Sequence, residues 1–256
     1  MFRRLLQLLL IGGLAYSGWH YRDQIEGLYR EFEAQRAGRG KAQAVPDPER
    51  YQVLKDELEL KRIHLSKRYG AARTATEISL VHTEARETLE EELPKLMRCW
   101  LGTPWDFSGT AQIPGEGKIA CGYYVSTVMR DAGFKVERIR LAQQASQNII
   151  GTFLPRDQMH VRAGMNYQKF LAEVAQRGPG VRIVGLDKHV AFLVVTNEGE
   201  VRFIHSSGGA AKSVVDQNQE EATTLQRSRY RVTGNITGSD EVVHEWLMGA
   251  SWKTQL

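Results

Sequence analysis

The sequence predicts an α+β protein in which helices come first along the chain and an antiparallel sheet follows. Apolar residues recur at helical spacing through residues 48–101, whereas β-branched residues dominate residues 181–205. The helices and the strands therefore form separate blocks along the chain. Such an order favours an α+β architecture over one in which helices and parallel strands alternate.

The first block predicts two long helices. One is expected from Pro48 to about Gly70, and the other from about Thr76 to Leu101. Pro94 should kink the second helix or begin its last section, because proline lacks the amide hydrogen that a helix interior uses. Taken alone, such helices serve packing and have no chemistry. One face of the second helix carries Leu89, Leu93, Leu96, Met97 and Trp100.

The rest of the chain predicts shorter helices and then a sheet. Apolar periodicity and turn residues place the helices at 121–132, 138–150 and 166–176, with a last short one opening near Ser239. Residues 189–195 and 201–205 are rich in β-branched residues and flank the turn Asn197-Glu-Gly-Glu200, so they predict a hairpin. Further strands are expected at 181–184 and, at the edge of the sheet, at 230–233.

Composition sets outer limits on the class of protein. The chain has 256 residues, 42% of them apolar and 25% charged, which is an ordinary globular mix and excludes wholesale disorder. The formal charge of +4 is not concentrated in a dense Lys/Arg stripe interleaved with aromatic residues, so nucleic-acid binding is not indicated. A mildly basic surface would suit an anionic polymer, although it more often serves solubility alone.

The N-terminus predicts export. Arg3 and Arg4 precede the apolar run 5–14, as in the basic and hydrophobic regions of a secretory signal. Ala15-Tyr16-Ser17 supplies small residues for a signal peptidase. The run is shorter than the roughly 20 residues of a full span, but residues 15–19 would extend it into an uncleaved anchor. We expect an exported protein that is periplasmic, anchored to the inner membrane or secreted.

Three residues form the main chemical constellation: Cys121, His189 and His205. Cys121 lies at an expected helix start, where the helix dipole and free backbone N–H groups favour a thiolate. His189 begins one strand of the hairpin and His205 ends the other, so the two imidazoles are expected side by side. This arrangement supplies a nucleophile, a base and a group that orients the base.

The two cysteines allow other interpretations. Cys99 is expected to be buried and inert, since it lies on a helix beside Trp100. A disulfide between Cys99 and Cys121 would silence a thiol enzyme. A zinc site built from Cys121, His189 and His205 lacks the closely spaced ligand pair that such sites use.

Four segments, in order along residues 85–210, resemble the motifs of NlpC/P60 cysteine peptidases. The first resembles the family's "LGTPYxWGG" motif and the second its "DCSGLVxxVxxxxG" nucleophile helix. The third resembles "HVGIYLG" and the fourth "xIHAS". Each block is weak alone, but four in the family's order are fairly specific. The segments are Leu101-Gly-Thr-Pro-Trp-Asp-Phe-Ser-Gly109, Ile119-Ala-Cys-Gly-Tyr-Tyr-Val-Ser-Thr-Val-Met-Arg-Asp-Ala-Gly-Phe134, Lys188-His-Val-Ala-Phe-Leu-Val194 and Phe203-Ile-His-Ser-Ser207.

The resemblance implies a papain-like core with a Cys–His–His triad formed by Cys121, His189 and His205. It implies hydrolysis of amide bonds in peptidoglycan stem peptides, often beside γ-D-glutamate and diaminopimelate, with no metal or organic cofactor. The expected partners are peptidoglycan or a peptide-like substrate, and the membrane if the N-terminus is uncleaved. The expected parts are a signal peptide or anchor (1–22), a linker (23–47), a helical extension (48–84) and a catalytic domain (85–256).

The chain also departs from the family pattern. Ala120 replaces the usual Asp before the cysteine, Gly122 replaces the Ser after it, and Trp105 replaces the Tyr of the first motif. Asp106 and Tyr123 are candidates to replace the lost polar groups. These departures keep two alternatives open: a thiol amidase, acyltransferase or toxin-like effector with another amide substrate, or a catalytically inactive wall-binding module. The candidate substrate-binding or oxyanion residues are Trp105, Asp106, Gly122 and Tyr123.

Overall fold

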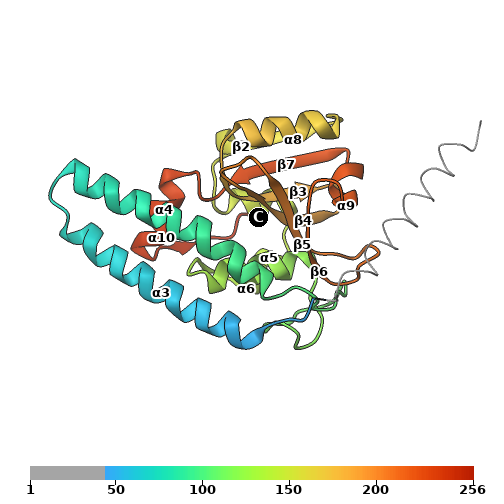
Figure 1. Ribbon diagram of the computed structural model, residues 1–256, viewed down its shortest axis with the longest axis horizontal. Helices are drawn as coiled ribbons and strands as arrows, with labels where there is room; N and C mark the ends of the chain where they lie inside the picture. The colour runs from blue at the N-terminus through green and yellow to red at the C-terminus, as the bar shows by residue number, and fades with distance from the viewer. Residues whose placement is uncertain (1–43) are drawn as a thin grey trace, which may run out of the picture. The chain divides into compact units, whose positions relative to one another are not determined.

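A six-stranded antiparallel sheet organises the computed structural model of the chain, which describes residues 44–256 (Figure 1). Its strands run in the order β2–β7–β3–β4–β5–β6. The expected signal or anchor at 1–22 and residues 23–43 of the linker lie outside the described residues. Within residues 44–256, no helix combines the length and apolarity needed to cross a membrane. The strands are β2 (Met159–Ala163), β3 (Gly180–Leu186), β4 (His189–Val195), β5 (Val201–Ser206), β6 (Val214–Gln217) and β7 (Tyr230–Asn235).

The two long helices are confirmed as α3 (Pro48–Ala71) and α4 (Ala75–Arg98). Asp47 caps α3 by accepting a hydrogen bond from the backbone N–H of Arg50 at 3.0 Å. Thr74 and Glu77 form a capping box at the start of α4. α4 continues through Pro94, so this proline does not begin a separate helix.

One large apolar cluster joins α3 and α4 to the body of the protein. It contains Leu58, Leu89 and Trp100, and continues through Tyr124 of α5 (Cys121–Asp131) to Phe192 of the sheet. The expected boundary between residues 84 and 85 therefore falls inside α4. The helical extension shares its core with the sheet, as one compact unit over residues 44–256. α10 (Asp240–Met248), capped by Ser239 as expected, packs beside α3 and α4.

A second, smaller apolar cluster covers the opposite face of the sheet. It is built by α8 (Tyr167–Gln176) and α9 (Thr223–Arg227), and it packs on Leu193 and Phe203. Figure 1 shows α8 on one side of the sheet and α3, α4 and α5 on the other. The described chain is thus a three-layer α+β arrangement, which confirms the fold class at that level.

The expectation that residues 230–233 form an edge strand was wrong. β7 lies inside the sheet, where it pairs with β3 on one side and with β2 on the other. β2 is the edge strand on that side of the sheet. Its pattern is the reverse of an amphipathic strand, because Val161 is exposed whereas Arg162 is buried. A strand that turns an arginine inward carries no apolar alternation by which it could be recognised.

The helix expected at 138–150 is broken in two. α6 (Arg138–Ala142) and α7 (Ser146–Gly151) are separated by a turn, and α6 lies against α5. A 3₁₀ helix follows at Arg156–Gln158. Two short strands, β1 (Lys135–Val136) and β8 (Ser251–Trp252), pair in parallel and attach the C-terminal segment to the end of α5.

Candidate active site

The start of α5 presents the Cys121 thiol and several free backbone N–H groups. Ala120, at the N-cap position, makes no side-chain capping bond, so the first N–H groups of the helix remain available. Burial raises the pKa of the Cys121 thiol, although interactions with the backbone N–H groups of Val190, Gly122 and Cys121 lower it in part. The resting thiol is therefore protonated at neutral pH, with donors already directed at the sulfur.

Close packing explains why a glycine follows this cysteine. A Cβ at Gly122 would collide with the backbone carbonyl of Ala142 in α6. The segment before the cysteine is fixed by Ser206, whose Oγ donates to the carbonyl oxygen of Ile119 at 2.7 Å. Sequence alone presented Gly122 as a lost polar group, whereas the structure makes it the residue that lets α6 approach the site.

The two histidines lie side by side on neighbouring strands, as expected. Nε2 of His189 lies 2.8 Å from Nδ1 of His205. On its other side, Nε2 of His205 lies 3.0 Å from Oε1 of Gln217 in β6. Gln217 was not predicted from the sequence, because its short strand Val214–Gln217 has only two β-branched residues to indicate a strand.

Proton positions in this chain follow from the acceptor at its end. An amide oxygen only accepts, so Nε2 of His205 carries a hydrogen and donates it to Oε1 of Gln217. In a neutral imidazole Nδ1 of His205 is then the acceptor, and Nε2 of His189 donates to it. The remaining ring nitrogen, Nδ1 of His189, is left as a lone-pair acceptor, and it has no hydrogen-bond partner among residues 44–256.

Both imidazoles are neutral near pH 7. Burial lowers the pKa of His189 to about 3, with a further lowering from the neighbouring His205. Burial also lowers the pKa of His205 to about 4, against a smaller opposing effect of Gln217. Neutral rings match this chain, because each imidazole donates through Nε2 and keeps a lone pair on Nδ1.

The Cys121 sulfur lies beside the first residues of β4. Val190 and Phe192 belong to the cluster that packs on α5, so strand alternation assigns His189 and His205 to the other face of the sheet, with Phe203. The sulfur meets the N–H of Val190, which is in the same peptide unit as the carbonyl of His189. Among the described residues, no hydrogen bond joins Cys121 to either imidazole.

Trp105, a candidate substrate-binding residue, is held against the loop after β5. Its backbone N–H donates to the carbonyl oxygen of Lys212 at 2.8 Å, and Nζ of Lys212 lies 4.7 Å from its ring centroid. The ring covers Gly208, where an added Cβ would meet it at 2.7 Å. A backbone bridge to Ile119 places Trp105 beside the segment that leads to Cys121.

Asp106 lines a cavity of about 640 Å³ formed by the loop that precedes the site. Its carboxylate accepts from the N–H of Ser108 at 2.9 Å and from Nζ of Lys118 at 3.2 Å, and these two contacts lower its pKa. The cavity is open, and none of the three triad candidates lines it. Its walls are formed by Asp106, Ser108, Gly109, Thr110, Ala111, Gln112, Ile113, Glu116, Gly117 and Lys118.

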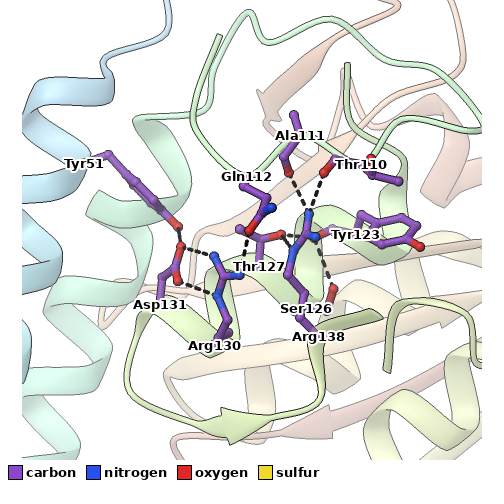
Figure 2. A network of polar contacts seen from close by, with 10 residues as sticks. All are labelled: Tyr51, Thr110, Ala111, Gln112, Tyr123, Ser126, Thr127, Arg130, Asp131 and Arg138. Atoms are coloured by element: carbon purple, nitrogen blue, oxygen red, sulfur yellow. Dashed lines mark hydrogen bonds and ion pairs between the residues drawn. The ribbon is translucent and has the colours of Figure 1, made fainter. Parts of the chain in front are cut away.

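A polar network ties this loop to α5 (Figure 2). Arg138 donates to the carbonyl oxygens of Thr110 and Ala111 at 2.9 and 2.7 Å, and to Oγ1 of Thr127 at 2.7 Å. Its guanidinium also lies 5.0 Å from the ring centroid of Tyr123, the last candidate site residue. Arg138 therefore holds the cavity loop and the first turn of α5 in one arrangement.

The second cysteine plays no part in the site. Cys99 and Cys121 are both free thiols, so no disulfide joins them. Cys99 is buried, as expected, and burial raises its pKa to about 11. Across residues 44–256, no group of three or more His, Cys, Asp and Glu side chains is placed to hold a metal ion.

Comparisons with known proteins give no family for this arrangement. No protein-family model and no curated protein matches the chain.

Proposed function

We propose that the protein is a cysteine hydrolase that cleaves an amide bond in peptidoglycan stem peptides, with a papain-like core of the NlpC/P60 type. The observation that carries the proposal is the chain Gln217–His205–His189, which ends in an unpaired Nδ1 on the strand that meets the Cys121 sulfur. A thiol nucleophile needs a nearby base that is held in place by a third group, and this chain of hydrogen bonds has that form.

The proposed reaction begins with proton transfer. As the Cys121 sulfur attacks the carbonyl carbon, its proton passes to Nδ1 of His189 and a C–S bond forms. His189 then gives that proton to the leaving amine nitrogen as the C–N bond breaks. Water attacks the thioester with His189 as base, the acid is released, and the thiol recovers its proton.

Charge on the carbonyl oxygen would be stabilised at the start of α5. The N–H groups of Cys121, Gly122 and Val190 interact with the sulfur, and those of Cys121 and Gly122 are not taken by a capping side chain at Ala120. An Asp at position 120, as in the family motif, would have a carboxylate near these donors. Because Ala120 has no carboxylate, these donors are available to the substrate.

The resting protonation states fit a base that acts during attack rather than a preformed ion pair. Burial raises the pKa of the thiol and lowers the pKa of both imidazoles, so thiol and His189 are neutral together. Hydrogen bonds between catalytic groups are often absent or long without substrate and shorten in the complex. We therefore propose that substrate binding brings Cys121 and His189 into contact.

The substrate class is supported by the four resembling segments and by charge. An isoelectric point near 9.0 suits an anionic polymer such as peptidoglycan. The cavity of the 106–118 loop adjoins the segment that leads to Cys121, because Trp105 and Thr110 both bridge to Ile119. We propose that Asp106 contacts the substrate in this cavity, that Trp105 and Tyr123 contact it outside the cavity, and that the protein works outside the cytoplasm.

The test compares two single-cysteine variants. Cys121→Ala should abolish release of fragments from purified muropeptides, measured by mass spectrometry, because the nucleophile is removed. Cys99→Ala, which removes the other free thiol, should retain activity. Undiminished cleavage by Cys121→Ala would overturn the assignment.

One observation favours a catalytically inactive wall-binding module. The thiol has a raised pKa and no hydrogen bond to an imidazole among the described residues, which is also how an inert buried cysteine would look. Peptidoglycan binding with neither cleavage nor labelling of Cys121 by a thiol probe would support this second function. Labelling without any released fragment would instead support an amidase or acyltransferase with another substrate.

A further inference from the structure

We infer that Gln217 is a positioning residue that decides which nitrogen of His189 carries a proton. The inference rests on the proposed function, since it concerns the base that would act on Cys121. Among residues 44–256, the side chain of Gln217 forms no hydrogen bond with the thiol or with His189. Its Oε1 lies 3.0 Å from Nε2 of His205. Its effect on His189 therefore passes through the ring of His205.

The position of Gln217 is fixed by the pairing of β6 with β5. Gln217 lies opposite Phe203, and His205 lies opposite Val215, so Gln217 and His205 are diagonal neighbours on one face. Asp216 lies on the other face, where its carboxylate pairs with Arg98 at 2.8 Å and with Arg202 at 2.9 Å. These two ion pairs hold the strand in a register that directs Gln217 at His205.

An amide side chain can set a proton direction because its two ends differ. With Oε1 toward His205, the hydrogens point away from His189, and Nδ1 of His189 keeps its lone pair. With the NH₂ group toward His205, every hydrogen in the chain would shift by one nitrogen, and Nδ1 of His189 would carry a hydrogen. Only the first arrangement leaves a base that can take the thiol proton.

Burial makes the partner of His205 decisive. His205 is only 1% exposed, so bulk water has little access to replace Gln217. Its other neighbours are the rings of His189 and Phe203, at centroid distances of 4.9 and 4.1 Å. Without Gln217, Nε2 of His205 would have no acceptor among these neighbours, and the preference between the two tautomers would be lost.

The closing experiment reads the tautomers directly. In ¹⁵N-labelled protein, two-bond ¹H–¹⁵N correlation spectra should show Nε2–H tautomers for both His189 and His205. Gln217→Glu should keep this pattern and raise the pKa of His205, because a carboxylate only accepts and favours imidazolium. Gln217→Leu should lose the pattern. Gln168→Leu, which replaces an exposed glutamine on α8, should change nothing.

A second readout is the pKa of His205, followed in the same spectra as the pH is changed. A Nδ1–H tautomer of His189 in the unmutated protein would overturn the inference, and so would an unchanged pattern in Gln217→Leu. If Gln217→Leu fails to fold, Gln217→Glu alone decides: a changed tautomer pattern or an unshifted pKa of His205 would overturn it.

Neither readout uses a substrate, so the two proposals fail separately. An intact tautomer pattern without cleavage of muropeptides would count against the proposed substrate and leave the role of Gln217 standing. A lost pattern with intact cleavage would count against Gln217 alone.

Discussion

The two faces of the central sheet are stabilised by different interactions. The face toward α5 is covered by large apolar side chains such as Trp100, Tyr124 and Phe192, stacked edge to face. The face toward α8 has a smaller apolar cluster, and three buried arginines donate there mainly to backbone carbonyls: Arg162, Arg182 and Arg231. The histidine pair belongs to this second, polar face.

The difference shows how buried polar groups can be kept inside a protein whose other face is apolar. On the apolar face, burial itself supplies the stability, at roughly 25 cal/mol for each Å² removed from water. On the polar face, each buried donor needs a partner, and the arginines donate to carbonyls of β2, β3, α9 and the loops beside α8 and α9. A layer already built from hydrogen bonds can hold two neutral imidazoles, which pair with each other and with Gln217.

The largest effect is expected on the apolar face. Trp100→Ala should lower the free energy of unfolding by about 3–5 kcal/mol, because the ring is fully buried against Tyr51 and Tyr124. Urea denaturation would measure it, with the 84% exposed Phe107 replaced by alanine as the control. A loss for Trp100→Ala as small as the control's would contradict an apolar layer stabilised by burial.

A somewhat smaller loss is expected on the polar face. Arg231→Met should cost about 2–4 kcal/mol, because it leaves the carbonyl oxygens of Leu225, Met165 and Gln226 without their donor. The same denaturation experiment applies, with the exposed Arg229 replaced by methionine as the matched control. A variant as stable as the unmutated protein would show that apolar packing alone can hold this layer.

The polar face should also make stability depend on pH. The folded-state pKa values of His189 and His205, about 3 and about 4, lie below the ordinary value of an imidazole. Above about pH 6.5 neither the folded nor the unfolded protein binds these protons, and the contribution of the two neutral imidazoles to the free energy of unfolding is fully present. As the pH falls below that value only the unfolded state binds them, so the free energy of unfolding falls by up to about 1.4 kcal/mol per pH unit for each imidazole.

Unfolding by urea between about pH 6.5 and pH 5 would measure this slope. His205→Gln should make it shallower by the share of one imidazole, since one group with a lowered pKa is removed. An equal slope in the variant would mean that His205 titrates alike in the folded and unfolded protein, contrary to its burial.

The smallest effect concerns a polar link within the apolar face. The hydroxyl of Tyr51 donates to the carboxylate of Asp131 at 2.9 Å, joining α3 to the end of α5 (Figure 2). Tyr51→Phe keeps the ring and should cost only about 1 kcal/mol. A loss as large as that of Arg231→Met would show that this face also depends on its hydrogen bonds.

Much of the local structure could be predicted from the sequence. The bounds of α3, α4, α5 and α8 follow from apolar periodicity and capping residues, because both act over only a few residues of chain. The hairpin of β4 and β5 followed in the same way from its turn, and it placed His189 beside His205. These features depend on residues that are close in the sequence, so they can be predicted from it.

Features that depend on distant neighbours were not predicted. The strands β2 and β6 were not predicted, because β2 buries an arginine and β6 is short. As a result, β7 was assigned to the edge of the sheet, and Gln217 was not recognised as the partner of His205. The close approach of α6 to Gly122 was equally hidden, since no spacing in the sequence shows which carbonyl will lie against a glycine.

The sequence by itself determined the α+β order of elements, the cysteine at a helix start and the two histidines on adjacent strands. Only the tertiary structure decided that the imidazoles belong to a polar face opposite α5, that Gln217 ends their hydrogen-bond chain, and that the sulfur lies beside the backbone of Val190. The physical reason is that helices and hairpins form from contacts near in sequence, whereas proton direction and burial depend on which distant strands become partners.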